Sequence, residues 1–277
     1  MSLAGVAKET LVIVARGSYR APSGAEVSVR EAVDRAVQGT RLYGPEELDR
    51  LLEHTSTTMP VRGPTIEVTP ESTAQAGRRL AQAEALPAVV ALNFASAKNP
   101  GGGFLGGAKA QEEDLARCSA LYTCQLTARD YYDANRACGS MLYTDRIIYS
   151  PAVPFFRDHG LRLLEQPFPL SIITAPAPNA GEALRRDPAG QVQIRATLQT
   201  RAGKVLAVAQ DQGHRVLVLG AWGCGVFRND PALVAEVFGG WLASPRFVGA
   251  FERVVFAIYD RSAGRATLRA FQTRFGS

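Results

Sequence analysis

Two adjacent glutamates behind a glycine-rich stretch are the residues of this sequence best suited to chemistry. Glu112 and Glu113 follow a triple glycine at residues 101–103. A glycine loop lets a ligand approach the backbone closely, because glycine has no Cβ and tolerates positive φ. A carboxyl group fixed beside a bond can then serve as general acid and base. This stretch therefore predicts an acid–base site.

The two carboxylates are expected to have separate roles. At the start of a helix they cannot both face one atom, nor flank a sugar from opposite sides as in ordinary glycosidases. One carboxylate would act first as acid and then as base on the same face. The helix start lowers its pKa, whereas burial or the neighbouring charge would raise it. Two first-turn acids that only complement the helix dipole are the alternative, which the preceding glycine loop disfavours.

A second glycine-rich loop predicts a phosphate site. The apolar run 216–219 leads into Gly220, Gly223 and Gly225, and Pro231 then suits the first turn of a helix. Successive backbone N–H groups in such a loop form a nest for anions. The alternative is a plain strand-to-helix turn, which needs fewer glycines. Both loops follow apolar strands, whose carboxyl ends bind ligands in open α/β sheets.

The first loop also matches the dinucleotide fingerprint G-x-G-x-x-G through Gly101, Gly103 and Gly106. That motif requires a tight turn and an acidic residue at the end of the next strand. Here residues 94–100 separate the strand from the first glycine, and residues 121–131 have a helical pattern. We interpret the match as coincidental, which disfavours a nicotinamide-dependent oxidoreductase.

The two loops together resemble the bacterial branch of the poly(ADP-ribose) glycohydrolase family. The triple glycine followed by Gln-Glu-Glu is similar to the family's catalytic loop, and Gly-Cys-Gly-Val-Phe to its diphosphate-binding loop. The resemblance covers most of residues 87–260 and implies a macrodomain-like fold. It also implies hydrolysis of the ribose–ribose O-glycosidic bonds of poly(ADP-ribose) to release ADP-ribose, without a cofactor.

The resemblance implies roles for individual residues. Glu113 is the preferred proton donor and Glu112 would hold a ribose hydroxyl, although the sequence leaves this division open. Phe227 would pack against the distal ribose. Asn93 could bind a ribose hydroxyl or only satisfy the end of its strand. The residues expected to bind substrate are Asn93, Asn99, Gly101, Gly102, Gly103, Gln111, Gly223, Cys224, Gly225, Val226 and Phe227.

Two related functions remain open. One is a macrodomain that only binds ADP-ribose, which has no need of the glutamate pair. The other is a hydrolase that removes single ADP-ribose groups from protein side chains. The expected partners are poly(ADP-ribose), ADP-ribose and ADP-ribosylated proteins. The sequence does not distinguish cleavage at chain ends from internal cleavage.

The pattern of elements predicts an α/β protein with a central sheet flanked by helices on both faces, and the macrodomain-like resemblance implies that the sheet is mixed. Apolar runs alternate with helical periodicity from about residue 60 onward. The predicted strands are residues 65–68, 88–93, 147–149, 170–175, 216–219 and 254–258. The predicted helices are residues 71–85, 115–134, 192–211, 231–243 and 265–275. Segments 149–157 and 174–179 follow strands and could line an adenosine pocket, although Phe155 and Phe156 suit core packing equally well.

The N-terminal residues have a different pattern. Helices are predicted at 3–16, 30–37 and 45–53, with a turn at 21–24 and a short strand around 27–29. We expect residues 1–60 to form an accessory helical segment. It would pack on a catalytic body of residues 61–277 within a single domain.

The composition indicates which classes of ligand and partner the protein could bind. The chain has 277 residues, 46% of them apolar and 21% charged, with a net charge of +5 that favours anionic ligands. It contains neither a basic tail, a membrane-length apolar run nor a secretory pattern, so we predict no direct nucleic-acid binding and no membrane association. Four cysteines without a C-x-x-C pair, and the isolated His54, His159 and His214, predict a cytoplasmic protein without a metal.

Overall fold

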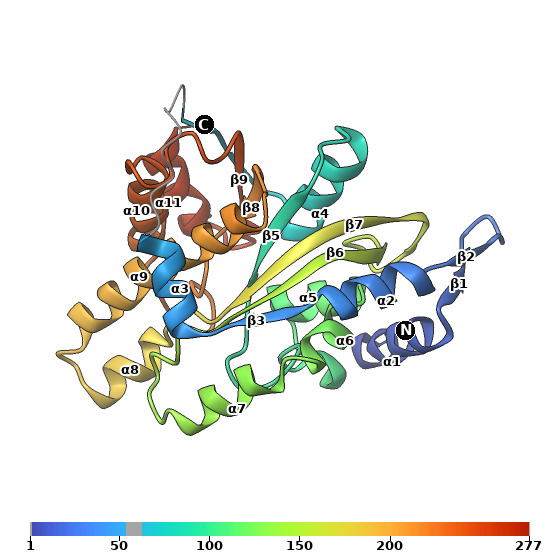
Figure 1. Ribbon diagram of the computed structural model, residues 1–277, viewed down its shortest axis with the longest axis horizontal. Helices are drawn as coiled ribbons and strands as arrows, with labels where there is room; N and C mark the ends of the chain where they lie inside the picture. Colours follow the sequence, from blue (N-terminus) through green and yellow to red (C-terminus); the bar gives the residue numbers. More distant parts are fainter. Residues whose placement is uncertain (1, 54–62, 277) are drawn as a thin grey trace.

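The computed structural model describes residues 2–53 and 63–276, which are built around a seven-stranded mixed sheet (Figure 1). From edge to edge the strands are β3 (Arg41–Tyr43), β6 (Ile147–Arg157), β7 (Leu163–Ala175), β5 (Val89–Phe94), β8 (Val216–Leu219), β9 (Arg253–Ala257) and β4 (Thr65–Thr69). Strands β7 to β4 in this order are parallel, whereas β6 is antiparallel to both β3 and β7. The carboxyl ends of the parallel strands therefore lie along one edge of the sheet.

Alternating side chains along the central strands separate two apolar cores. In β5, Val90 and Leu92 pack on one face, and Val89 and Ala91 on the other. The first core lies against α3 (Pro45–Glu53), α8 (Ala180–Arg186), α9 (Gln191–Asp211), α10 (Pro231–Leu242) and α11 (Ala266–Phe275). The second lies against α1 (Leu3–Arg16), α2 (Arg30–Gly39), α4 (Thr73–Arg78), α5 (Gln111–Cys118) and α6 (Leu121–Leu126). Helices thus cover both faces, as predicted (Figure 1).

Two of the predicted strands are the ends of longer ones. The predicted strands 147–149 and 170–175 belong to β6 and β7, a long antiparallel pair with irregular register between Ser150 and Val153. Residues 151–157 therefore lie inside the sheet. Phe155 and Phe156 are fully buried in the second core, so the expectation that this segment lines a nucleotide pocket is not met.

The predicted single helix over residues 115–134 is wrong. Three helices occupy that region: α5, α6 and α7 (Arg129–Ala137). Ser119 is extended, with φ −149° and ψ −178°, and forms a bridge with Phe155 of β6. The N–H of Ala120 donates to the carbonyl of Pro154 at 3.2 Å. Pairing with the sheet, which no local pattern reveals, ends α5 at this point. The predicted helix 71–85 is likewise divided, into α4 and a π-helical turn, η1 (Arg79–Ala83).

The N-terminal segment contributes directly to the sheet. β1 (Ser18–Arg20) and β2 (Glu26–Ser28) form a small hairpin, and β3, which the pattern did not predict, pairs with β6 at the sheet edge. Leu48 of α3 is buried in the first core. The expected boundary between residues 60 and 61 lies outside the described residues, so the division into an accessory segment and a catalytic body remains a prediction. His54 also lies outside the described residues.

Candidate active site

The side chain of Gln111 links the first turn of α5 to the end of β5 through hydrogen bonds. Its side-chain oxygen accepts a hydrogen bond from the N–H of Phe94 at 2.8 Å. Its amide nitrogen donates to the carbonyl of Leu92 at 2.8 Å and to Thr73 Oγ1 at 3.0 Å. These contacts hold the helix start, and the glutamates beside it, at the carboxyl end of a central strand. Gln111 thus positions the helix, and its expected contact with substrate remains a prediction.

Glu112 is the more deeply buried glutamate, with 2% of its surface exposed. Its Oε1 accepts hydrogen bonds from Asn93 Nδ2 at 3.0 Å and Gln125 Nε2 at 2.8 Å. Its Oε2 accepts one from the N–H of Ser96 at 2.6 Å. These donors favour the charged form, but burial dominates and raises the pKa of Glu112 to about 7. Protein groups therefore occupy both oxygens of this carboxyl and fix its orientation.

Glu113 has a different environment, with 8% of its surface exposed. Its Oε1 accepts a hydrogen bond from the N–H of Gly103 at 2.9 Å. Within residues 2–53 and 63–276, its Oε2 accepts none. This oxygen has room for a further partner, whereas both oxygens of Glu112 are already hydrogen-bonded.

Gly102 lies against both carboxyl groups. A Cβ at this position would be 2.4 Å from Glu113 Oε1 and 3.2 Å from Glu112 Oε2, and its φ is +58°. Both the lack of space and the left-handed backbone therefore require glycine. Gly101 has φ +63°, and its N–H donates to Gln125 Oε1 at 2.8 Å. Gln125 thus joins the triple-glycine loop to Glu112.

The asparagines differ in what they can contact. Asn93 is fully buried, and its Nδ2 donates to Glu112 and to Thr174 Oγ1 at 3.1 Å, so it orients the carboxyl group. Asn99 is exposed, and its side chain makes no hydrogen bond within the described residues, so it is available to a ligand. The sequence pattern did not indicate Ser96 or Gln125. Gln125 lies between apolar helix positions, and only its complete burial beside Glu112 distinguishes it.

The second glycine loop connects β8 to α10. Its glycines at 223 and 225 differ in backbone conformation and in the space around them. Gly223 has φ +71°, and a Cβ there would be 2.4 Å from Asn229 Nδ2 and 2.5 Å from Ala177 Cβ. Gly225 has no atom within 4 Å of an added Cβ, and its φ is not positive. The fold therefore requires glycine at 223, whereas at 225 it leaves space.

Four backbone N–H groups of this loop are free. Those of Gly223, Gly225, Val226 and Phe227 donate to no group of the described chain. Val226 is 82% exposed, so this stretch is open to ligands. These unpaired N–H groups, called the N–H nest below, are available to an anion. The phosphate site expected there remains a prediction. Burial raises the pKa of Cys224 to about 12, so this thiol stays neutral.

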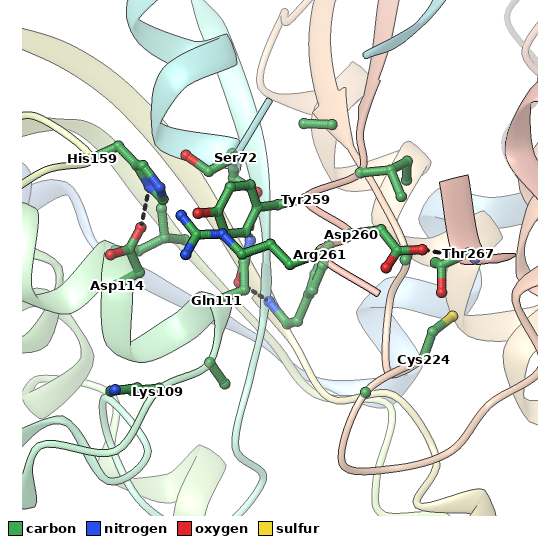
Figure 2. A pocket seen from close by; sticks show the side chains of 18 of the residues that line it. Ser72, Lys109, Gln111, Asp114, His159, Cys224, Tyr259, Asp260, Arg261 and Thr267 are labelled. Atoms are coloured by element: carbon green, nitrogen blue, oxygen red, sulfur yellow. Dashed lines mark hydrogen bonds and ion pairs between the residues drawn. The ribbon is translucent and has the colours of Figure 1, made fainter. Parts of the chain in front are cut away.

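A cavity of about 610 Å³ adjoins both loops. Residues from α5 and from loop 221–225 line one part of it, including Gln111, Asp114, Cys224 and Gly225. Residues after β9 line another part, including Tyr259, Asp260, Arg261 and Thr267, and Leu3, Ser72 and His159 also contribute to the lining. Figure 2 shows Tyr259 and Arg261 projecting between the His159–Asp114 pair on one side and Asp260 and Thr267 on the other.

Glu112 and Glu113 do not line this cavity, although Gln111 and Asp114 of the same helix do; their carboxyl groups lie against Gly102. The site is therefore elongated, with carboxyl groups, N–H nest and cavity in different parts of it. The sequence did not indicate His159, Tyr259, Asp260 or Thr267 as candidates. No glycine motif accompanies them, and only the position after a parallel strand could have suggested the last three.

Two other kinds of feature are absent from the part of the chain that the structure describes. No group of three or more His, Cys, Asp or Glu side chains there could hold a metal ion. No described helix is both long and apolar enough to cross a membrane.

Comparison with known proteins assigns the arrangement to a family. Residues 7–158 match the model of the microbial-type PARG catalytic domain. The chain belongs to this family. It is 48% identical to poly(ADP-ribose) glycohydrolase (PARG) from Thermomonospora curvata, with 99% of each chain covered and a TM-score of 0.94. The same protein bound to the inhibitor ADP-HPD gives a TM-score of 0.90 at 48% identity, again with 99% of each chain covered.

A second bacterial PARG extends the comparison. The enzyme from Deinococcus radiodurans in complex with ADP-ribose is 50% identical, with 90% of this chain and 99% of that chain covered and a TM-score of 0.84. A search of curated proteins found no match. The predicted relationship to bacterial PARG and the macrodomain-like α/β fold are therefore confirmed.

Proposed function

We propose that this member of the PARG family hydrolyses the ribose–ribose O-glycosidic bonds of poly(ADP-ribose) and releases ADP-ribose. The supporting observation is the arrangement around Gly102, where two carboxyl groups meet a glycine loop, together with the unpaired N–H groups of the loop that follows the neighbouring strand β8. The similarity to PARG structures that contain ADP-ribose or ADP-HPD supports the same ligand class.

The substrate's terminal unit would lie along the elongated site. The diphosphate accepts hydrogen bonds from the free N–H groups of residues 223–227. The adenosine enters the cavity, whose volume of about 610 Å³ is within the usual range for ligand pockets. The distal ribose then reaches Gly102, with Phe227 against it and Asn99 near its hydroxyls. Binding remote from the bond in this way positions the scissile bond at the carboxyl groups.

Glu113 acts as acid and then as base in this mechanism. Its protonated carboxyl donates a proton to the departing ribose oxygen as the C1–O bond breaks and an oxocarbenium-like centre forms. The resulting carboxylate takes a proton from water, whose oxygen bonds to C1. The unoccupied Oε2 of Glu113 supports this choice, because both oxygens of Glu112 accept hydrogen bonds from the protein. Glu112 would hold a ribose hydroxyl and orient the leaving group.

The proposed partners are poly(ADP-ribose), ADP-ribose and ADP-ribosylated proteins. We place the protein in the cytoplasm. Its four cysteines are all free, which suits a reducing compartment.

Product identification tests the proposed activity. The purified protein is incubated with poly(ADP-ribose) and, separately, with a protein that carries single ADP-ribose groups. We expect ADP-ribose to be released rapidly from the polymer and slowly or not at all from the singly modified protein. Release only from the latter would instead identify a mono-ADP-ribosyl hydrolase. Binding of ADP-ribose without release from either substrate would identify a non-catalytic binding protein.

A further inference from the structure

A half-buried tyrosine outside both glycine loops contacts the aromatic residue at the end of the N–H nest. The rings of Tyr143 and Phe227 have centroids 6.0 Å apart and are inclined at 41°. Tyr143 lies in the connection between α7 and β6, far from Phe227 in sequence. It has φ +62°, a left-handed conformation that is uncommon for a residue with a large side chain.

A buried arginine holds this unusual backbone in place. Arg201 of α9 is 1% exposed, and its guanidinium donates to the carbonyls of Leu142 at 3.0 Å and Tyr143 at 3.4 Å. It also donates to Asp145 Oδ1 at 2.9 Å and to the carbonyl of Pro176 at 2.7 Å. A buried cation with these partners fixes the loop that carries Tyr143 to the end of β7.

The neighbouring residues of the same loop are held as well. Asn135 Oδ1 accepts hydrogen bonds from the N–H and the hydroxyl of Thr144 at 2.8 and 2.9 Å. The carbonyl of Met141 accepts one from the N–H of Asn179 at 2.8 Å. The ring of Tyr143 is therefore presented to Phe227 by a backbone fixed on both sides.

We infer that Tyr143 is a positioning residue for the reaction, which holds the Phe227 ring in the orientation that restrains the distal ribose. The inference rests on the proposed function, because it assigns Phe227 that contact with substrate. Without the tyrosine ring, Phe227 has one neighbour fewer in a loop where the residues on either side of it, Val226 and Arg228, are exposed. The ribose would then be restrained less well during bond cleavage, while the N–H nest would remain intact.

The left-handed backbone of Tyr143 allows two variants that lack the ring to be compared, one with and one without backbone strain. Tyr143→Gly and Tyr143→Ala both remove the ring, but glycine tolerates φ +62° whereas alanine remains strained. We expect kcat on poly(ADP-ribose) to fall by about two- to tenfold in both, as is typical for loss of an aromatic pair, with a higher Tm for Tyr143→Gly. Tyr143→Phe retains the ring and should keep a kcat close to that of the parent. ADP-ribose affinity, measured by calorimetry, should change less than kcat.

A double-mutant cycle provides the decisive comparison. If Tyr143 acts through Phe227, adding Tyr143→Gly to Phe227→Ala should lower kcat no further. An equal fall of kcat in both backgrounds would overturn the inference, as would a parent-like kcat for Tyr143→Gly. A parent protein that does not cleave the polymer would instead contradict the proposed function itself, so the two failures are distinguishable.

Discussion

Glu112 and Glu113 are neighbours in sequence, and the fold places them in different surroundings. Glu112 accepts hydrogen bonds from two side-chain amides and one backbone N–H, whereas Glu113 accepts one from Gly103. The expectation of separate roles agrees with this difference. At this scale it is the set of hydrogen-bond donors, more than the type of residue, that distinguishes a carboxyl group with both oxygens hydrogen-bonded from one with an oxygen left free.

The raised pKa of Glu112 predicts a pH-dependent contribution to stability. Its pKa rises from an ordinary value of 4.5 to about 7 on folding, so the folded protein binds more protons than the unfolded chain between these values. This contribution is present at low pH and is lost as the pH rises through 7. Between about pH 5 and about pH 8, the free energy of unfolding of the parent should fall relative to Glu112→Gln by on the order of 2 kcal/mol.

Urea unfolding of both proteins at the two pH values measures this difference. Any constant cost of the glutamine cancels, because only the change with pH is compared. Parallel pH profiles for parent and variant would show that Glu112 keeps the same pKa in both states.

Gly225 allows the N–H nest to be tested without disturbing the fold. An added side chain there meets no protein atom, so Gly225→Ala and Gly225→Val should fold normally. In the complex, the side chain would meet the phosphate oxygens. ADP-ribose affinity should fall by roughly ten- to a hundredfold for valine, consistent with loss of one hydrogen bond to a charged group, and by less for alanine.

Calorimetric titration with ADP-ribose measures these affinities. Gly223→Ala serves as the contrast, because its Cβ would meet Asn229 and Ala177, so its Tm should fall. A folded Gly225→Val protein with parental affinity would mean that the loop is only a turn.

Helix α1 packs against the turn that follows the triple glycine. Its Ala7 packs in a small cluster with Phe104 of the 3₁₀ turn η2 (Phe104–Gly106) and Ala116 of α5. The N-terminal segment thus contacts both the residues after the triple glycine and the helix that carries the glutamates. Leu3 also lines the cavity.

The stabilising contribution of α1 can be measured through one buried hydrogen bond. Thr10 Oγ1 donates to the carbonyl of Arg117 at 2.7 Å, and this carbonyl lies in the last turn of α5, where helical partners are missing. Thr10→Val keeps the shape but leaves a buried acceptor unpaired. We expect it to lower the free energy of unfolding by about 1–3 kcal/mol.

Denaturant unfolding measures the free energy of unfolding of Thr10→Val, with Thr197→Val as the control. Thr197 makes an exposed hydrogen bond to the carbonyl of Gln193 within its own helix, so its loss should have little effect. Equal destabilisation by the two substitutions would argue against a special contribution from α1.

Local sequence predicts some of these elements well and others poorly. Strands β5, β8 and β9 are apolar on both faces and end in recognisable turns, so their positions could be predicted. The short edge strand β3 contains Arg41 and has no such pattern, and the break at Ser119 arises from pairing with Phe155. Likewise both glycine loops were predicted because glycine patterns are local. Gln125 and Tyr143 depend on contacts between distant segments and could not be predicted.

In the whole molecule, the parallel strand ends bring distant segments together at one edge. Loop 95–110 follows β5, loop 220–230 follows β8, and the residues that line the far part of the cavity follow β9. Because these strands are neighbours in the sheet, carboxyl groups, N–H nest and cavity lie side by side. The proposed function assigns binding and chemistry to different loops, so substitutions should separate the two.

Removal of metal ions tests whether carboxyl groups and backbone N–H groups are sufficient for the reaction. The proposed mechanism uses only carboxyl groups and backbone N–H groups, so dialysis against a chelator should leave turnover of poly(ADP-ribose) unchanged. The assay compares initial rates before and after dialysis. Lost activity that returns on adding a divalent ion would show that the mechanism lacks a component.

The most direct test of the account combines turnover and binding in glutamate variants. Glu113→Ala and Glu112→Ala should each lower turnover of poly(ADP-ribose) by roughly 10²–10⁴-fold, the usual value of a positioned general acid. ADP-ribose should still bind, because the N–H nest on loop 220–230 is unchanged. If both single variants retain near-parental turnover, the carboxyl groups beside Gly102 do not carry the reaction and the account is contradicted.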